Sequence, residues 1–221
     1  MITPLTRVQR LWYAFVRSLV VGFCKTFWRL KVEGTEHVPD GPFILSPVHR
    51  SNIDTPLVAA VTRRPLRYMG KDAMWKYGFS AWFFTSLGGF PVHRGTADRE
   101  ALKKSVAVLE GGEPLVLFPE GTRRSGPVVE DVFDGAAYVA LRTGMPIVPV
   151  GIGGSEAAMP KGARFIRPVK LTMVIGEPLH PPVTEGGARV PRRAVRELTA
   201  ELQERLQQLF DEAQKKAGAA A

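Results

Sequence analysis

Residues 43–54 read FILSPVHRSNID, an apolar run followed by a polar turn. Its first three residues, 43–45, are apolar and predict a strand. His49 and Asp54 then lie on either side of the turn that leads from this strand into the next helix. A strand followed by a polar turn and a helix is the repeating unit of an α/β domain.

The same alternation continues along the chain after residue 31. Short apolar runs predict strands, and amphipathic segments bounded by cap and stop signals predict the helices between them. We expect strands at 43–45, 66–70, 90–93, 115–118, 147–152 and 169–175, and helices at 98–110, 133–143 and 192–216. The 221 residues suit one medium domain, so the pattern predicts an α/β fold with a mixed, mostly parallel sheet flanked by helices.

The pair His49 and Asp54 is the first candidate for chemistry. An aspartate bound to one ring nitrogen fixes the histidine tautomer and leaves the other nitrogen free to take a proton. No serine or cysteine nucleophile stands beside the pair, so we expect the substrate to supply its own hydroxyl. The same spacing also occurs in turns that are merely hydrogen-bonded.

A second candidate is the hexapeptide FPEGTR at residues 118–123, which follows the predicted strand 115–118. Gly121 lets the backbone approach a ligand, Thr122 offers a hydroxyl, and the guanidinium of Arg123 suits a phosphate. Glu120 would align Arg123 or bind a substrate hydroxyl. The alternative is a plain turn with an internal ion pair.

Further cations and an apolar motif follow the other predicted strands. Arg94 is a candidate phosphate ligand, whereas strand alternation gives His93 a structural place. Lys71 stands at the end of strand 66–70 and is either a second cation of the site or a solvated surface lysine. The run MPIVPV at residues 145–150 includes Pro149 and forms a wall for an apolar group, or simply core.

The net charge of +9 is concentrated at the N-terminus. Residues 1–31 contain six basic side chains and no acidic one: Arg7, Arg10, Arg17, Lys25, Arg29 and Lys31. On a helical wheel the first five fall within an arc of roughly 120°, and aromatic and aliphatic residues occupy the rest. We therefore expect residues 1–31 to be an amphipathic helix at an anionic membrane surface, and residues 32–221 to be the α/β domain.

Two alternatives stay open for the apolar segments. The N-terminal helix would otherwise pack on its own domain; spanning a bilayer is not expected, because its longest uncharged run has seven residues. Residues 77–92 carry no charge and predict a short buried helix leading into a strand. The other interpretation of this segment is a wall for an alkyl chain or a second membrane contact.

Four of these segments together resemble the glycerolipid acyltransferase family, typified by 1-acylglycerol-3-phosphate acyltransferases. That family shows His-x4-Asp, a Gly-rich motif ending in arginine, Phe-Pro-Glu-Gly-Thr-Arg and a proline-flanked apolar motif, in the order found here from His49 to Pro149. Two positions depart from the family pattern. Val48 stands where asparagine is frequent, and Arg124 precedes Ser125 where serine often follows the motif arginine directly.

The resemblance implies roles for these residues. His49 is the general base and Asp54 orients it. Arg94 and the loop Glu120, Gly121, Thr122 and Arg123 bind the substrate phosphate, Lys71 matches a basic position between the first two motifs, and Pro149 belongs to the acyl-side motif. No metal and no cofactor is implied, because the co-substrate is the thioester of acyl-CoA or acyl carrier protein.

The implied reaction acylates the free hydroxyl of 1-acylglycerol 3-phosphate and gives phosphatidic acid in phospholipid biosynthesis. Glycerol 3-phosphate or another lysophospholipid is the alternative acceptor. The implied location is peripheral, or monotopic, on the cytoplasmic face of the cell membrane, with membrane lipids, an acyl donor and a glycerol-phosphate acceptor as partners. A membrane-bound phospholipid-binding protein without catalysis is the competing class. No nucleic-acid motif accompanies the basic residues, so nucleic acid is not an expected partner.

Overall fold

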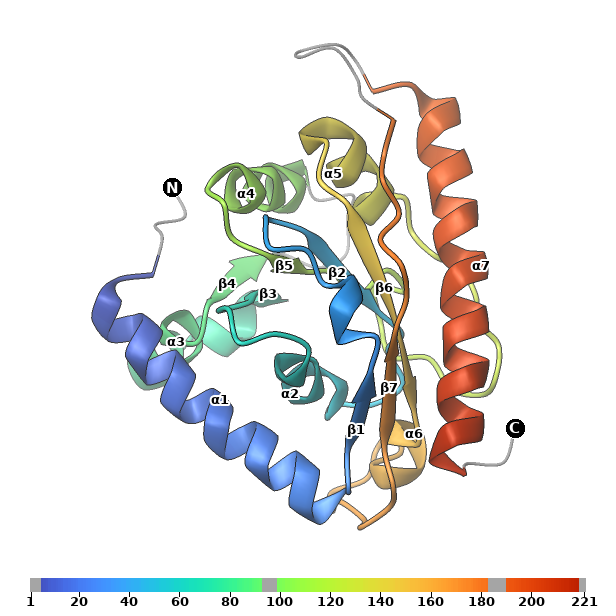
Figure 1. Cartoon of the computed structure of the whole chain (residues 1–221). Helices are drawn as coiled ribbons and strands as arrows, with labels where there is room; N and C mark the ends of the chain where they lie inside the picture. Colours follow the sequence, from blue (N-terminus) through green and yellow to red (C-terminus); the bar gives the residue numbers. More distant parts are fainter. Residues whose placement is uncertain (1–4, 93–98, 183–189, 219–221) are drawn as a thin grey trace.

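The computed structural model describes residues 5–92, 99–182 and 190–218 and contains a seven-stranded sheet in the order β1-β7-β6-β2-β5-β3-β4 (Figure 1). The strands are β1 (Lys31–Glu33), β2 (Ile44–Pro47), β3 (Arg67–Lys71), β4 (Gly89–Val92), β5 (Leu115–Val116), β6 (Ile147–Gly153) and β7 (Thr172–Ile175). Neighbouring strands run parallel except β6 and β7, which pair antiparallel. The predicted mixed, mostly parallel sheet is confirmed.

The expected strands are found within a few residues of their predicted limits, but β1 was not predicted. It has three residues, alternates between exposed and half-buried positions, and pairs only with β7 at the edge of the sheet. So short a segment leaves no apolar run for a pattern to detect. The predicted strand residue His93 and helix residue Asp98 lie outside the described residues.

Helices cover both faces of this sheet. They are α1 (Arg7–Phe27), α2 (Asp54–Leu57), α3 (Gly78–Ser86), α4 (Arg99–Glu110), α5 (Gly135–Thr143), α6 (Ser155–Ala158) and α7 (Arg192–Ala217), with 3-10 turns η1 (Thr35–His37), η2 (Val58–Ala60) and η3 (Asp72–Trp75). α7 packs along β6 and β7 and contacts α5, which contacts α4. α1 packs against α2 and η2 on the opposite side of the sheet from α7 (Figure 1).

The centre of the core is β6, whose seven residues are all buried. Two of its glycines let α7 come very close. A Cβ on Gly151 would lie 2.1 Å from the backbone oxygen of Leu209, and a Cβ on Gly153 the same distance from that of Ala213. Side chains at these positions would push the helix off the sheet, so the glycines fix the depth of this layer.

α1 is docked on the domain by the face that carries Arg17. Tyr13, Val21 and Cys24 are buried there, and Arg17 Nε donates to the backbone oxygens of Ala59 and Thr62, at 2.8 and 2.7 Å. The exposed face of α1 is largely apolar, with Val8, Leu11, Phe15, Leu19 and Phe23 between 44% and 75% exposed. The helix is amphipathic, as expected. Arg17, however, does not face outward, because its side chain binds η2 and the residue Thr62 of the domain. Among the described residues, no helix has both the length and the apolarity to cross a bilayer.

α3 forms the short helix expected between residues 77 and 92, leading into β4. It is not the buried helix that the apolar composition predicted. Phe79 is 77% exposed and Trp82 57% exposed. Trp82 lies near Trp12 of α1, with 6.2 Å between ring centroids, so the exposed aromatic surfaces of α1 and α3 adjoin.

Candidate functional site

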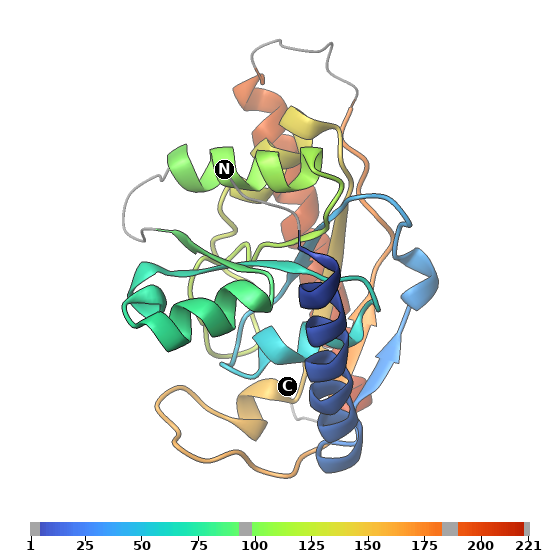
Figure 2. The ribbon, with the colours of Figure 1, turned by 90° about the vertical axis from the view of Figure 1, so that its left-hand side faces the viewer.

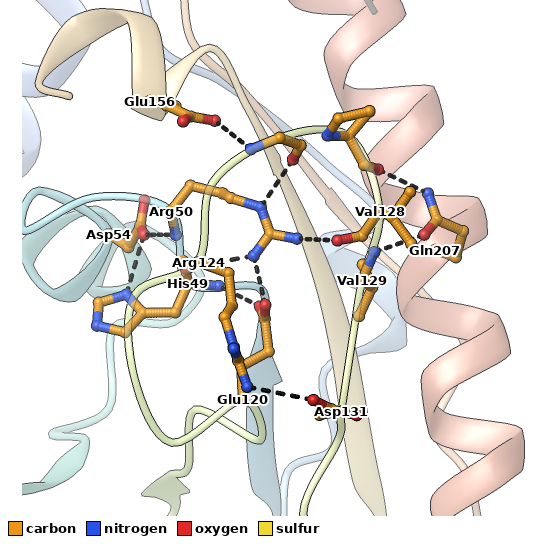
Figure 3. A network of polar contacts seen from close by, with 12 residues as sticks. His49, Arg50, Asp54, Glu120, Arg124, Val128, Val129, Asp131, Glu156 and Gln207 are labelled. Atoms are coloured by element: carbon orange, nitrogen blue, oxygen red, sulfur yellow. Dashed lines mark hydrogen bonds and ion pairs between the residues drawn. The ribbon is translucent and has the colours of Figure 1, made fainter. Parts of the chain in front are cut away.

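His49 and Asp54 meet at the carboxyl end of β2, as their spacing predicted. Nδ1 of His49 lies 3.1 Å from Oδ2 of Asp54. Because a carboxylate only accepts hydrogen bonds, Nδ1 carries the ring proton in the neutral imidazole and Nε2 keeps its lone pair. Nε2 points away from the surrounding polar network (Figure 3). The site therefore holds an oriented imidazole with one nitrogen available as a proton acceptor.

Asp54 is fully buried and is fixed by the turn that precedes it. Its Oδ2 also accepts from the backbone N–H groups of Arg50, at 2.7 Å, and Ser51, at 2.6 Å. Three donors thus converge on one oxygen, which leaves the carboxylate little freedom to rotate. These two amides are used by Asp54, so donors for an oxyanion have to come from other groups.

The ring of Phe118, the first residue of the hexapeptide and two residues after the end of β5, stacks on the imidazole. Their centroids are 4.1 Å apart and the planes are inclined by 29°. With the hydrogen bond to Asp54, this contact leaves 13% of the His49 side chain exposed. The exposed part is the part that a substrate can reach.

Glu120 is buried and forms an ion pair with Arg50, whose side chain is also fully buried. The other carboxylate oxygen, Oε1, accepts from the backbone N–H of His49 at 2.8 Å. Glu120 therefore holds the base in place through its backbone. The sequence predicted that Glu120 binds a substrate hydroxyl or aligns Arg123. Its side chain instead binds Arg50 and the backbone of His49.

Arg50 extends this network to the segment after the hexapeptide (Figure 3). Its guanidinium donates to the backbone oxygens of Gly126, at 3.2 Å, and Val128, at 3.0 Å, and lies 4.8 Å from the ring centre of Phe210 on α7. The backbone N–H of Arg124 donates to the oxygen of His49 at 2.9 Å. The loop that follows β5 is thereby tied to the turn that carries the base.

The residues predicted to bind phosphate differ in how exposed they are. Gly121 and Thr122 are exposed and Arg123 is half-buried. Arg123 lies three residues after Glu120, whose side chain binds the His49 N–H, and one residue before Arg124, whose backbone N–H binds the His49 oxygen. Gly121 has φ +64°, and a Cβ there would lie 2.8 Å from the ring of Phe133, so this turn needs glycine. Lys71 is exposed at the end of β3. Arg94 lies outside the described residues.

Pro149 lies inside β6, not on the wall of a cleft. It pairs with Ser46 of β2, its oxygen accepts from the backbone N–H of Gly176 at 2.9 Å, and it is buried. The sequence left open whether residues 145–150 form a wall for an apolar group or part of the core, and the placement of Pro149 matches the core.

Sequence reasoning missed Arg50 and Phe118 as parts of the site. Arg50 directly follows His49, but its partner Glu120 is 70 residues away, and no spacing rule connects them. The signal that would have raised the question is an arginine placed directly between the candidate base and the turn, close to a buried strand, where a charge needs a partner.

A cavity elsewhere in the molecule and the acidic, histidine and cysteine side chains were the other candidates for a site. A cavity of about 440 Å³ is lined by residues of α1, β3, β4 and α4, among them Arg67 and Lys104. None of the residues placed around His49 lines it. Among the described residues, no three His, Cys, Asp or Glu side chains gather in a way that would hold a metal ion.

The model of a family described as Acyltransferase matches residues 29–153, more than half of the chain. The crystal structure of the 1-acyl-sn-glycerophosphate (LPA) acyltransferase PlsC from Thermotoga maritima superposes with a TM-score of 0.72 and 26% identity, covering 94% of this chain and 84% of that one.

Two curated relatives match at the sequence level. The 1-acyl-sn-glycerol-3-phosphate acyltransferase of Bacillus subtilis is 28% identical over 68% of this chain and 74% of its own length. The chloroplastic 1-acyl-sn-glycerol-3-phosphate acyltransferase LPAT1 of Arabidopsis thaliana is 25% identical over 70% of this chain. The match spans 44% of the Arabidopsis protein, and about half the length of several other curated relatives.

Proposed function

This chain belongs to the acyltransferase family, and from that membership we propose that it transfers an acyl group from an acyl thioester to the free hydroxyl of 1-acylglycerol 3-phosphate. The product would be phosphatidic acid. The observation that carries the proposal is the His49–Asp54 contact of 3.1 Å, with Nε2 of the imidazole left free.

The proposed reaction uses His49 first as a base and then as an acid. Nε2 takes the proton from the acceptor hydroxyl while that oxygen attacks the thioester carbonyl carbon, and Asp54 stabilises the imidazolium that forms. The tetrahedral intermediate collapses with cleavage of the carbon–sulfur bond, and His49 returns its proton to the leaving thiolate. No residue of the chain is acylated in this sequence.

Arg123 and the names of the relatives support 1-acylglycerol 3-phosphate as the acceptor. Arg123 is held close to His49 by the contacts of Glu120 and Arg124, and its guanidinium matches the geometry of a phosphate. We give Arg94 and Lys71 the same role on the family resemblance. The relatives from Bacillus subtilis and Arabidopsis thaliana are named for 1-acylglycerol 3-phosphate, which favours this acceptor over glycerol 3-phosphate.

A membrane location supports the same acceptor. The product is a lipid with two acyl chains, and the exposed apolar surfaces of α1 and α3 adjoin on one side of the molecule. Such a surface inserts into the boundary between headgroups and acyl chains. We propose peripheral association through this surface, on the cytoplasmic face of the cell membrane.

A direct assay tests the proposal. Purified protein is given one acyl-CoA and, in separate reactions, 1-acylglycerol 3-phosphate, glycerol 3-phosphate or no acceptor, and free thiol and lipid product are measured. We expect release of thiol that depends on 1-acylglycerol 3-phosphate and matches phosphatidic acid mole for mole. Preference for glycerol 3-phosphate would replace the acceptor, and acyl carrier protein thioesters tested in parallel identify the donor. Vesicle binding without any acceptor-dependent thiol release would favour the non-catalytic lipid-binding class.

A further inference from the structure

We propose that residues 159–167, here called the 159–167 loop, are a second contact with anionic lipid, placed beside the catalytic turn. This inference rests on the proposed function, because it concerns how that site meets the membrane. It is independent of α1 and α3, whose apolar faces are described above.

The loop has the composition of a lipid contact. Residues 157–176 contain four basic residues and no acidic one. Phe165 is 83% exposed, the highest exposure among the large apolar residues described, and Ile166 beside it is 38% exposed. Lys161, Arg164 and Arg167 are exposed around them. Within the described part of the chain, no ion pair is found for these three cations.

The loop is closed at its base and is therefore preformed. The backbone N–H of Arg167 donates to the oxygen of Ala158 at 2.8 Å, and that of Ala163 donates to the oxygen of Pro160 at 3.0 Å. Gly162 supplies the left-handed conformation of the turn, with φ +87°. A preformed loop loses little conformational freedom on binding, so its side chains meet a surface at low entropic cost.

Two hydrogen bonds place the loop between the site and α1. Its first residue, Met159, accepts from Oγ of Ser51 at 2.7 Å, in the turn that joins His49 to Asp54. Its last residue, Arg167, accepts from Nε1 of Trp28 at 2.9 Å, at the end of α1. Figure 2 shows the loop at the lower left, running to the C-terminal end of α1. The base of the loop thus lies beside the catalytic turn at one end and beside the C-terminal end of α1 at the other.

An aromatic side chain ringed by unpaired cations fits a lipid headgroup layer. The ring enters the boundary with the acyl chains while the cations remain with the phosphates. Each Lys or Arg near an anionic surface strengthens binding by about fivefold, which converts from about 1 kcal/mol per cation. An acidic protein would satisfy the cations but would leave Phe165 without a matching apolar environment. We therefore assign the loop to the bilayer.

Vesicle partitioning tests the charges. The full chain and the Lys161→Gln/Arg164→Gln variant are sedimented with vesicles containing 30 mol% anionic lipid, on the order of a cell-membrane fraction. The matched control is Arg196→Gln/Arg205→Gln, which removes the same charge from exposed positions on α7, the helix on the opposite side of the sheet from α1. We expect the loop variant to lose about tenfold or more in partition coefficient and the control variant less than about twofold. Equal losses in both variants would overturn the proposal.

Site-specific labelling tests the insertion of the aromatic residue. Cys24 is the single cysteine and is 1% exposed, so Phe165→Cys creates one accessible thiol. An environment-sensitive dye at position 165 should shift to the blue on anionic vesicles. The same dye on Ala200→Cys, an exposed position of α7, should not shift. A dye at 165 that stays in water on vesicles, or that shifts only with acyl carrier protein, would overturn the assignment to lipid.

The inference and the proposed function fail in distinguishable ways. If the wild-type protein shows no acceptor-dependent thiol release, the proposed function is wrong, whereas the vesicle and dye results still decide the role of the loop. If the enzyme is active and the loop variants partition and acylate vesicle-borne acceptor as the wild type does, only the inference about the loop is wrong.

Discussion

At the scale of single residues, the buried pair of Arg50 and Glu120 is what the turn of His49 depends on. Both side chains are fully buried, and Glu120 also binds the backbone of His49. Glu120→Gln would leave the Arg50 charge buried without a counter-ion, and breaking such a pair costs about 3–5 kcal/mol. We expect this loss in the free energy of unfolding, measured by urea denaturation.

The exposed pair of Arg193 and Glu197 on α7 provides the control for this prediction. Glu197→Gln should leave the urea midpoint where it is in the wild type, because solvent-exposed pairs contribute little. A Glu120→Gln protein with an unchanged midpoint would show that the buried pair does not support the fold.

Single-residue roles were only partly predictable from sequence. His49 and Asp54 are five residues apart, so local geometry brings them together, and the contact could be foreseen. Arg50 and Glu120 meet because β2 and β5 are neighbours in the sheet, which is a tertiary fact. Glu120 was accordingly assigned to the substrate, although the fold turns it toward Arg50.

At the scale of elements, the contact between α7 and β6 depends on glycine. Gly151→Ala would place a Cβ 2.1 Å from a backbone oxygen of α7, so the helix must shift or the strand must bend. Overpacking of this kind costs about 1–3 kcal/mol. We expect a lower thermal midpoint, whereas Gly41→Ala, with no atom within 4 Å of the added Cβ, should melt close to the wild type. Equal midpoints for both variants would contradict the packing described.

α1 is the element whose exposed face is expected to bind membrane. Leu11 and Phe15 are 74% and 58% exposed, so replacing both by glutamine removes little packing in the free protein. On vesicles the same change removes two inserted side chains and should lower the partition coefficient by at least about tenfold. Urea denaturation measures the stability of the free protein, and sedimentation with vesicles measures the partition coefficient. Unchanged partitioning would show that α1 does not contact lipid.

The element pattern was predictable where the periodicity was long and failed where it was short. Six strands and the three long helices after residue 98 were placed because their apolar residues repeat. β1 was missed for lack of length. In α3, composition alone suggested burial, but Phe79 and Trp82 are exposed, because apolar composition does not distinguish the core from an exposed apolar surface.

At the scale of the whole molecule, the question is whether residues 1–31 are a unit apart from the α/β domain. Cys24 of α1 is 1% exposed and its pKa is raised to about 11 by burial. Both effects slow alkylation at neutral pH, since the thiolate is the reactive form. If α1 is part of one cooperative fold, alkylation should follow the urea unfolding curve. Alkylation at much lower urea would show that α1 detaches by itself.

The central claim for the whole molecule is that His49, oriented by Asp54, takes the proton of the acceptor hydroxyl. The most direct test is the rate of acceptor-dependent acyl transfer by His49→Ala and Asp54→Asn, with circular dichroism spectra to verify folding. Asparagine keeps an oxygen for the three donors to Oδ2, removes the charge, and replaces the other carboxylate oxygen with an NH2 group. We predict that both folded variants lose at least about 100-fold in rate. A folded variant of either kind that turns over near the wild-type rate would contradict the claim.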